Sequence, residues 1–120
     1  MKIKIDPADK YFSLYVRELA NNTCVKCGGT SGLQCSHFQG RRKEATRFDP
    51  DNADCLCFGC HAYFTANPYE HVQWQIKVKG QTLVDQVVFR SNQYCKKDRK
   101  MQELIWKKAY SDLLKENVSK

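Results

Sequence analysis

The sequence predicts an α+β fold in which a small, cysteine-rich core with two strands is flanked by α-helices. Apolar residues recur at helical spacing before residue 22 and again after residue 67. Segment 23–57 is instead rich in glycine and cysteine and lacks that spacing. Because 120 residues is the length of one domain, we expect a single domain over 1–120. We divide it into an N-terminal helix (1–22), a core (23–66) and a helical C-terminal extension (67–120).

The first expected element is an amphipathic helix. Asp6 followed by Pro7 is typical of a helix N-cap and first helical position. The helix is expected to end near Asn21 and Asn22. Its apolar side chains lie at helical spacing: Phe12, Tyr15, Val16 and Leu19.

The core is expected to contain two short strands joined by a long basic loop. The stretch "GLQCSHF" (32–38) fits one strand and "ADCLC" (53–57) fits the other. A short helix can then run from Phe58 to Asn67. It must end there because the residue before Pro68 disfavours the helical conformation.

Three helices are expected to complete the chain. Pro68 can begin the first, which Gly80 ends. The stretch "TLVDQVVFRSNQY" (82–94) fits the second, and 98–117 fits the last. The last helix carries one apolar stripe, made of Met101, Leu104, Ile105, Leu113 and Leu114.

The charge of the chain points to a polyanionic partner such as nucleic acid. The sequence has 20 Lys and Arg residues and 13 Asp and Glu residues, a net charge of +7. A merely soluble basic protein could have the same total, so the positions of the charges matter. One cluster spans Lys96 to Lys100, and another occupies the core loop at Arg41, Arg42, Lys43 and Arg47.

The use of cysteine favours metal binding over disulfide bonds. The start of the chain, "MKIKIDPADK", lacks the apolar stretch of a secretory signal, and no run of about 18 apolar residues is present. We therefore expect a cytoplasmic protein that does not span a membrane. Seven cysteines, an odd number, argue against a disulfide framework in that reducing compartment.

Two C-x-x-C pairs are the strongest metal signal in the sequence. Cys24 and Cys27 form the first pair, and Cys57 and Cys60 form the second. Each pair can hold one side of a tetrahedral Zn²⁺, with each sulfur about 2.3 Å from the ion. The two pairs therefore predict one structural zinc bound by four cysteines.

The residues around these pairs are assigned as follows. Gly28 and Gly29 favour a tight turn after the first pair, because glycine accepts a positive φ. Cys35, Cys55 and Cys95 are expected to be small buried hydrophobic residues. An exchange of Cys55 for Cys57 as a zinc ligand stays open.

The order of His37, Asn52 and His61 among the cysteine pairs resembles that of the HNH (ββα-metal) nucleases over residues 24–64. The asparagine stands five residues before the first cysteine of the second pair ("DNADCLC"). A histidine follows the last cysteine ("CFGCH"), and another ends a strand ("LQCSHF"). The resemblance implies a β-hairpin and a helix around a divalent cation, with zinc bracing the core, and a metal-dependent DNA endonuclease activity.

The flanking sequence looks like the lambda NinG (Rap) family of phage recombination nucleases. The matching stretches are "CSHFQGRR", "RFDPDN" and a helical tail with a central glycine. This resemblance implies a phage protein, located in the bacterial cytoplasm, that cuts branched DNA such as Holliday junctions. A homodimer formed through the terminal helices would place two sites on such a junction, although no residue demands it.

The HNH resemblance also implies a role for each site residue. His37 would be the general base that deprotonates water, a task suited to a neutral imidazole. Asn52 would tie the long loop to the backbone and orient His37, while His61 would bind the catalytic Mg²⁺ or Mn²⁺. The basic loop residues would contact DNA phosphates. His71 has no motif around it and is expected at the surface.

Ser36 departs from the HNH pattern and keeps two alternatives open. Many HNH nucleases have Asp or His here as a second metal ligand, and a serine hydroxyl binds a hard cation poorly. One alternative is a non-catalytic zinc module that binds DNA. The other is an HNH nicking or double-strand endonuclease without preference for branches. Candidates for the missing ligand are Gln39, Asp51, Asp54 and Thr65.

Overall fold

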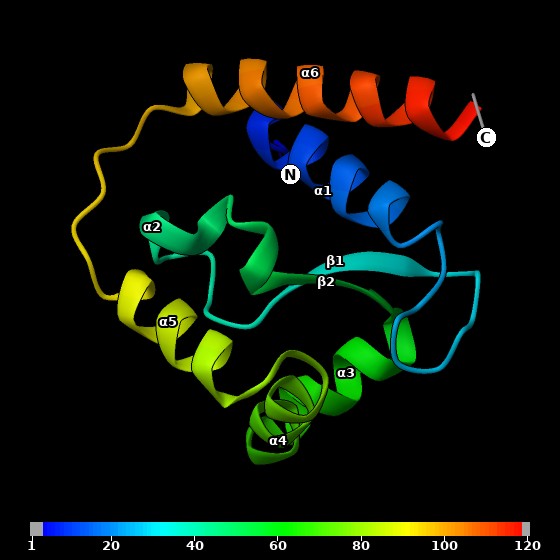
Figure 1. Cartoon of the computed structure of the whole chain (residues 1–120), viewed down its shortest axis with the longest axis vertical. Coiled ribbons are helices and arrows are strands. Elements are labelled where there is room, and N and C mark those ends of the chain that lie inside the picture. Colours follow the sequence, from blue (N-terminus) through cyan, green and yellow to red (C-terminus); the bar gives the residue numbers. More distant parts are fainter. Residues whose placement is uncertain (1–3, 119–120) are drawn as a thin grey trace.

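The computed structural model describes residues 4–118, and this part of the chain has six α-helices, one 3-10 helix and a two-stranded antiparallel sheet (Figure 1). The predicted α+β class is therefore confirmed. Met1–Ile3, which belong to the stretch used above against a secretory signal, lie outside the described residues, as do residues 119–120. None of the described helices has the length and apolar character needed to cross a membrane.

The helices and strands follow the expected order, and their ends lie within a few residues of the expected ones. Two single turns in the basic loop, α2 and η1, are not predicted by the sequence because they are too short to show a periodicity. The elements are α1 (Pro7–Leu19), β1 (Leu33–His37), α2 (Glu44–Arg47), η1 (Pro50–Asn52), β2 (Ala53–Cys57), α3 (Phe58–Ala66), α4 (Pro68–Lys79), α5 (Gln81–Ser91) and α6 (Arg99–Val118).

Helix α1 begins and packs as its sequence predicts. The side chain of Asp6 accepts a hydrogen bond from the backbone N–H of Ala8 at 2.9 Å, which is the expected N-cap contact. The buried residues Phe12 and Val16 face the sheet and join a core cluster with Cys55 of β2. Helix α1 therefore covers one face of the hairpin.

The strands β1 and β2 form a hairpin that lies between two groups of helices. Leu33 pairs with Cys57 at one end of the hairpin, and His37 pairs with Ala53 at the other. Figure 1 shows α1 and α6 on one side of this hairpin and α3 and α4 on the other. Since α3 begins directly after Cys57, its first turn lies at the end of the hairpin where Cys57 pairs with Leu33, and His61 contacts Gln34 there.

The face by which α6 packs differs from the expected apolar stripe. Trp106 fills the contact with α1, where its ring centre lies 4.9 Å from that of Phe12. Because α6 packs chiefly against α1, only a narrow strip of its surface is buried, and the indole of Trp106 occupies that strip. The side chains of four stripe residues are therefore exposed: Met101, Leu104, Ile105 and Leu114.

Candidate functional site

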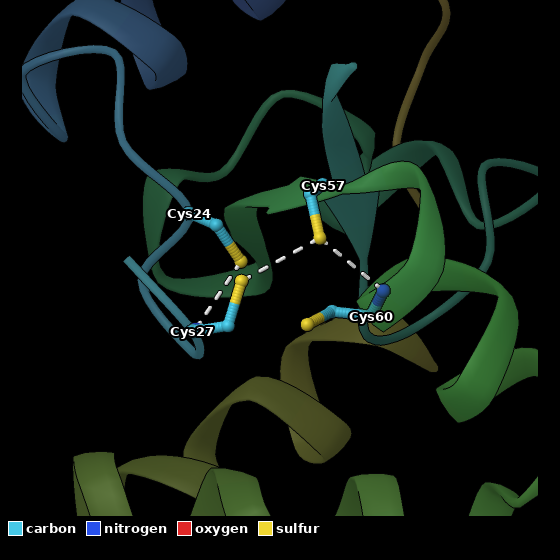
Figure 2. Close-up of side chains that lie close together, drawn as sticks. All are labelled: Cys24, Cys27, Cys57 and Cys60. Carbon is cyan, nitrogen blue, oxygen red and sulfur yellow. Dashed lines mark hydrogen bonds between the residues drawn. The ribbon is translucent and has the colours of Figure 1, made fainter. Parts of the chain in front are cut away.

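The structure brings the four predicted zinc cysteines together. Their sulfur atoms all lie within 4.8 Å of one another, and Figure 2 shows the four side chains around a common centre. The sulfurs of Cys27 and Cys57 are 3.7 Å apart. A tetrahedral site with a Zn–S distance of about 2.3 Å requires sulfurs about 3.8 Å apart. The cluster can therefore hold a metal ion such as zinc.

Backbone N–H groups around the cluster stabilise thiolates, which are the form that binds a metal. The N–H of Cys60 contacts the sulfur of Cys57 at 3.4 Å, and the N–H of Cys27 contacts that of Cys24 at 3.5 Å. Burial opposes ionisation of Cys24, but the backbone N–H groups of Cys27, Cys57 and Lys26 outweigh it and lower the pKa of Cys24 to about 6. Gly28 permits the turn that presents the N–H groups of Lys26 and Cys27, with φ of +81°.

The fourth thiol shows why a cation suits this cluster. Burial, followed by the neighbouring sulfurs, raises the pKa of Cys60 to about 12. Four thiolates in this space would repel one another, and a divalent cation at their centre offsets that repulsion. The chemistry of the donor set therefore agrees with its geometry.

The other three cysteines lie outside the cluster. Cys55 is buried, as expected, with 1% of its surface exposed, and burial raises its pKa. Cys35 is only half-buried and lines the groove, although burial raises its pKa to about 12, so both thiols are neutral. Cys57, rather than Cys55, turns toward the other ligands. The expectation for Cys95 was wrong, because this residue is exposed in the irregular segment between α5 and α6.

His37 is held at the end of β1 by one ring nitrogen. Its Nε2 lies 2.9 Å from the backbone oxygen of Arg47. A carbonyl oxygen only accepts, so Nε2 carries the proton and Nδ1 keeps a lone pair. Burial lowers the pKa of His37 below its ordinary value, although the bond to Arg47 opposes this. His37 is therefore a neutral imidazole with an unshared lone pair at neutral pH.

Asn52 fixes the loop that carries the Arg47 carbonyl. Its side chain is fully buried, and its Oδ1 accepts from the backbone N–H of Gln39 at 2.7 Å. Its Nδ2 donates to the backbone oxygens of Gln39 and Thr46 at 2.9 and 3.0 Å. Thr46 directly precedes Arg47. Asn52 thus fixes both ends of the loop whose last carbonyl holds His37.

His61 lies in the first turns of α3 and is also fixed by one ring nitrogen. Its Nδ1 contacts Oε1 of Gln34 on β1, so Nδ1 donates and Nε2 keeps its lone pair. His37 and His61 line the same groove, which has a volume of about 920 Å³ and lies between α1 and the hairpin. The sequence gives no signal for Gln34, because the contact joins residues on different elements.

The structure supplies few further ligands for a second metal near His61. Within residues 4–118, the four-cysteine cluster is the one group of three or more Cys, His, Asp or Glu side chains at metal-binding distance. Ser36 is buried, and the Oγ1 of Thr65 donates to the backbone oxygen of His61 at 3.0 Å. Asp54 is already paired with Lys79 at 3.1 Å. His61 therefore offers one protein ligand, which a strongly hydrated cation can accept.

The basic loop divides into bracing and exposed residues. Arg47 was expected to contact DNA, but it forms two hydrogen bonds with Asp9 of α1, one of them 2.9 Å long. Although burial opposes it, Arg47 lowers the pKa of the Asp9 carboxyl. Arg47 therefore joins α2 to α1, and its charge is neutralised there. By contrast, Arg41 is exposed beside His37 in the groove, and Arg42 is exposed on the same loop.

Within the described part of the chain, Lys43 is neither paired with an acid, as Arg47 is, nor as exposed as Arg41 and Arg42. Its Nζ donates to three uncharged side chains: Gln39, Ser91 and Asn92. The ammonium is held in place without being neutralised. It therefore keeps its positive charge on the surface of the loop.

Besides Gln34, sequence reasoning missed three residues near the site. Lys10 and Arg17 of α1 line the groove opposite the hairpin, and their spacing of two helical turns places them on one helix face. His71 of α4 was expected at the surface. It is instead half-buried and stacks on Phe64 with ring centres 4.5 Å apart. The helical spacing could have revealed the α1 pair, whereas His71 depends on tertiary packing.

No protein-family model, curated protein or solved structure matches the chain. The resemblance to HNH and NinG nucleases therefore stays a prediction. We base the function on the geometry of His37, Asn52 and His61 and on the groove that both histidines line.

Proposed function

We propose that the protein is a metal-dependent DNA endonuclease that hydrolyses phosphodiester bonds, with branched recombination intermediates such as Holliday junctions as its substrates. One observation carries this proposal. His37 and His61 are each fixed through one ring nitrogen, each leaves the other nitrogen unshared, and both residues line one groove. One unshared nitrogen can take a proton, and the other can bind a cation.

His37 is suited to the role of general base. Nδ1 must be unprotonated to accept a proton from water, and burial lowers the pKa of His37 so that it is neutral at cellular pH. The Arg47 carbonyl holds the ring and Asn52 fixes the loop that carries this carbonyl, so no reorientation is needed when the proton moves. The water deprotonated at Nδ1 would attack the phosphorus in line with the leaving oxygen. The products would carry 5′-phosphate and 3′-hydroxyl ends.

The groove is suited to an anionic strand. Lys10 and Arg17 line its α1 side, and Arg41 lies on the loop beside His37. Positive charge along the walls of a groove attracts the phosphodiester backbone, and the basic side chains can then contact its phosphates. Lys10 and Arg17 replace Arg47 in the proposed set of phosphate contacts, while Arg41, Arg42 and Lys43 remain in it.

Two metals would serve different purposes in this account. Zinc held by the four cysteines would link the loop after α1 to the first turn of α3, and so fix the helix that carries His61. Mg²⁺ or Mn²⁺ held by Nε2 of His61 would stabilise the negative charge that develops on phosphate oxygens. The remaining coordination positions would be filled by water and by the substrate.

A second candidate function is a non-catalytic zinc module that binds DNA. Ser36 favours it, because this residue is buried and stands where a second metal ligand is expected. Within the described residues no Asp, Glu or Cys joins His61 in a group of three metal ligands. In this alternative the positively charged groove would bind DNA, but the protein would not hydrolyse phosphodiester bonds.

Cleavage of a panel of labelled DNAs tests the proposal. The panel contains a four-way junction, a flap, a single strand and a linear duplex, each incubated with Mg²⁺ or Mn²⁺. We expect metal-dependent cleavage of the junction by the wild type and none by His37→Ala. Equal cleavage of the linear duplex would favour the endonuclease without branch preference. Binding without cleavage on every substrate would favour the zinc module.

A further inference from the structure

A second, smaller pocket adjoins the groove and contains all three histidines of the chain. It has a volume of about 350 Å³, and His37 and His61 line it as well as the groove. Its far wall is formed by α4, which contributes His71. The proposed reaction uses two of these histidines and leaves the third without a role.

The proton of His71 is located by a buried hydrogen-bond chain. The Nε2 of Gln75 lies 2.8 Å from Oδ2 of Asp54 and 3.1 Å from Nε2 of His71. A carboxylate only accepts, so the atom of Gln75 that faces Asp54 is its amide nitrogen. The second hydrogen of that nitrogen then faces His71, whose Nε2 must accept it. The His71 proton is therefore on Nδ1.

Packing around these hydrogen bonds keeps Asp54, Gln75 and His71 fixed. Only 1% of the Gln75 surface is exposed, and Lys79 holds the same carboxylate oxygen of Asp54 at 3.1 Å. The His71 ring stacks on Phe64, and Phe38 contacts it edge-on with ring centres 5.3 Å apart. Within residues 4–118 the Nδ1–H of His71 has no hydrogen-bond acceptor. A neutral N–H donor is thus presented without a protein partner.

This arrangement distinguishes two roles for His71. A metal ligand needs a lone pair, but Nε2 of His71 accepts from Gln75 and its Nδ1 is protonated. The group suits an acceptor, and a phosphate oxygen is the acceptor that the proposed substrate brings. Burial lowers the pKa of His71, so this tautomer is not lost to protonation at neutral pH.

We propose that the Nδ1–H of His71 donates a hydrogen bond to a non-bridging phosphate oxygen of the bound strand, so that the second pocket is a nucleotide subsite beside the scissile bond. This inference rests on the proposed nuclease function. The apolar side chains of Phe38 and Val72 in the same pocket would contact the sugar or base of that nucleotide.

Three variants separate a donor from a packing residue. His71→Phe keeps a ring against Phe64 and removes the N–H, whereas His71→Asn loses the ring and keeps a donor near the position of Nδ1. Tyr69→Ala removes an exposed ring of α4 that lines neither the pocket nor the groove. We expect kcat/KM to fall about 10- to 100-fold in His71→Phe, to recover in part in His71→Asn and to stay near wild type in Tyr69→Ala. A greater loss in His71→Asn than in His71→Phe would overturn the donor role.

Imidazole nitrogen NMR of the wild type tests the subsite without relying on cleavage. We expect Nδ1 of His71 to be protonated in the free protein and its signal to move on titration with thymidine 5′-monophosphate. If the wild type does not cut DNA but this signal moves, the nuclease proposal fails and the phosphate subsite stands. If the wild type cuts DNA and the signal does not move, or Nδ1 is unprotonated, the subsite is overturned.

Discussion

The backbone oxygen of Arg47 lies 2.9 Å from Nε2 of His37 and decides which nitrogen of that imidazole carries the proton. The same loop is pinned by Asn52, which binds the backbone of Gln39 and of Thr46. Asn52 makes no hydrogen bond to His37 itself, but it fixes the backbone that places the Arg47 carbonyl against this ring. This relationship yields the first prediction.

Replacing Asn52 by alanine is expected to impair both folding and catalysis. The change leaves one backbone N–H and two carbonyls without partners in a buried place, at a cost of about 1–3 kcal/mol for each unsatisfied group. Because the two Gln39 groups are only partly buried and can bind water, we expect the free energy of unfolding to fall by about 2–4 kcal/mol in total. Below the unfolding transition, kcat should fall more than KM rises. Urea denaturation and steady-state cleavage measure the two effects.

Asn92→Ala serves as the control for this prediction. Asn92 is exposed and accepts a hydrogen bond from Lys43, so its loss should change stability by less than about 0.5 kcal/mol. Equal stability of Asn52→Ala and Asn92→Ala would contradict the bracing role of Asn52.

The pH dependence of cleavage should report the environment of His37. Burial lowers the pKa of His37, and only the neutral imidazole can act as a base. Activity should therefore persist as the pH falls through about 6.5, the ordinary histidine value, and be lost at a lower pH. A pH profile of kcat/KM measures the midpoint, with zinc content checked at each pH. A midpoint above the ordinary value would exclude a buried, neutral His37 as the base.

Metal content should distinguish the cluster cysteines from the others. Cys57→Ser removes a sulfur from the four-cysteine cluster, and we expect it to abolish stoichiometric zinc and to lower the melting temperature. Cys95→Ser changes an exposed thiol outside the cluster and should leave one zinc per chain. Elemental analysis of the purified variants gives the ratio directly. One retained zinc in Cys57→Ser would show that Cys57 is not a ligand.

Arg47 and Arg41 should differ in what their loss affects. Arg47→Gln leaves Asp9 without its partner, and we expect a loss of stability of about 1–3 kcal/mol. Arg41→Gln should leave stability nearly unchanged and weaken DNA binding, because this residue lines the open groove. Thermal unfolding and a binding titration separate the two effects. A loss of DNA affinity without loss of stability in Arg47→Gln would restore Arg47 as a phosphate contact.

The α1 side of the groove should contribute phosphate contacts. Lys10→Gln and Arg17→Gln are each expected to weaken DNA binding and to reduce the slope of log K against log salt concentration by about 1. Lys108→Gln, on the exposed side of α6 and paired with Asp112, is the charge-matched control. If all three variants bind with the same affinity and slope, α1 does not contact the strand.

The parts of the site that the sequence predicted depend on local spacing. The spacing within each C-x-x-C pair lets two sulfurs bind one metal ion, and the presence of two such pairs predicted the four-cysteine cluster. The N-cap of α1 at Asp6 and the end of α4 at Gly80 followed from local backbone chemistry in the same way.

The parts that the sequence did not predict depend on partners far apart in the chain. Arg47 was assigned to DNA because the loop is basic, but its partner Asp9 lies on α1. The acceptor that orients His61 is Gln34, which lies on β1. Gln75 lies one helical turn from His71, but the Asp54 carboxylate that orients Gln75 is on β2. No local pattern marks such pairs, because only the assembled fold brings them together.

The most direct test of the central claim is single-turnover cleavage of a labelled four-way junction by the wild type and by His37→Ala, with the ends of the products identified. We predict Mg²⁺- or Mn²⁺-dependent products with 5′-phosphate and 3′-hydroxyl ends for the wild type. His37→Ala should bind the junction with unchanged affinity, retain its zinc and yield no product. Equal cleavage by the two proteins, or binding without cleavage by the wild type in both metals, would contradict the account.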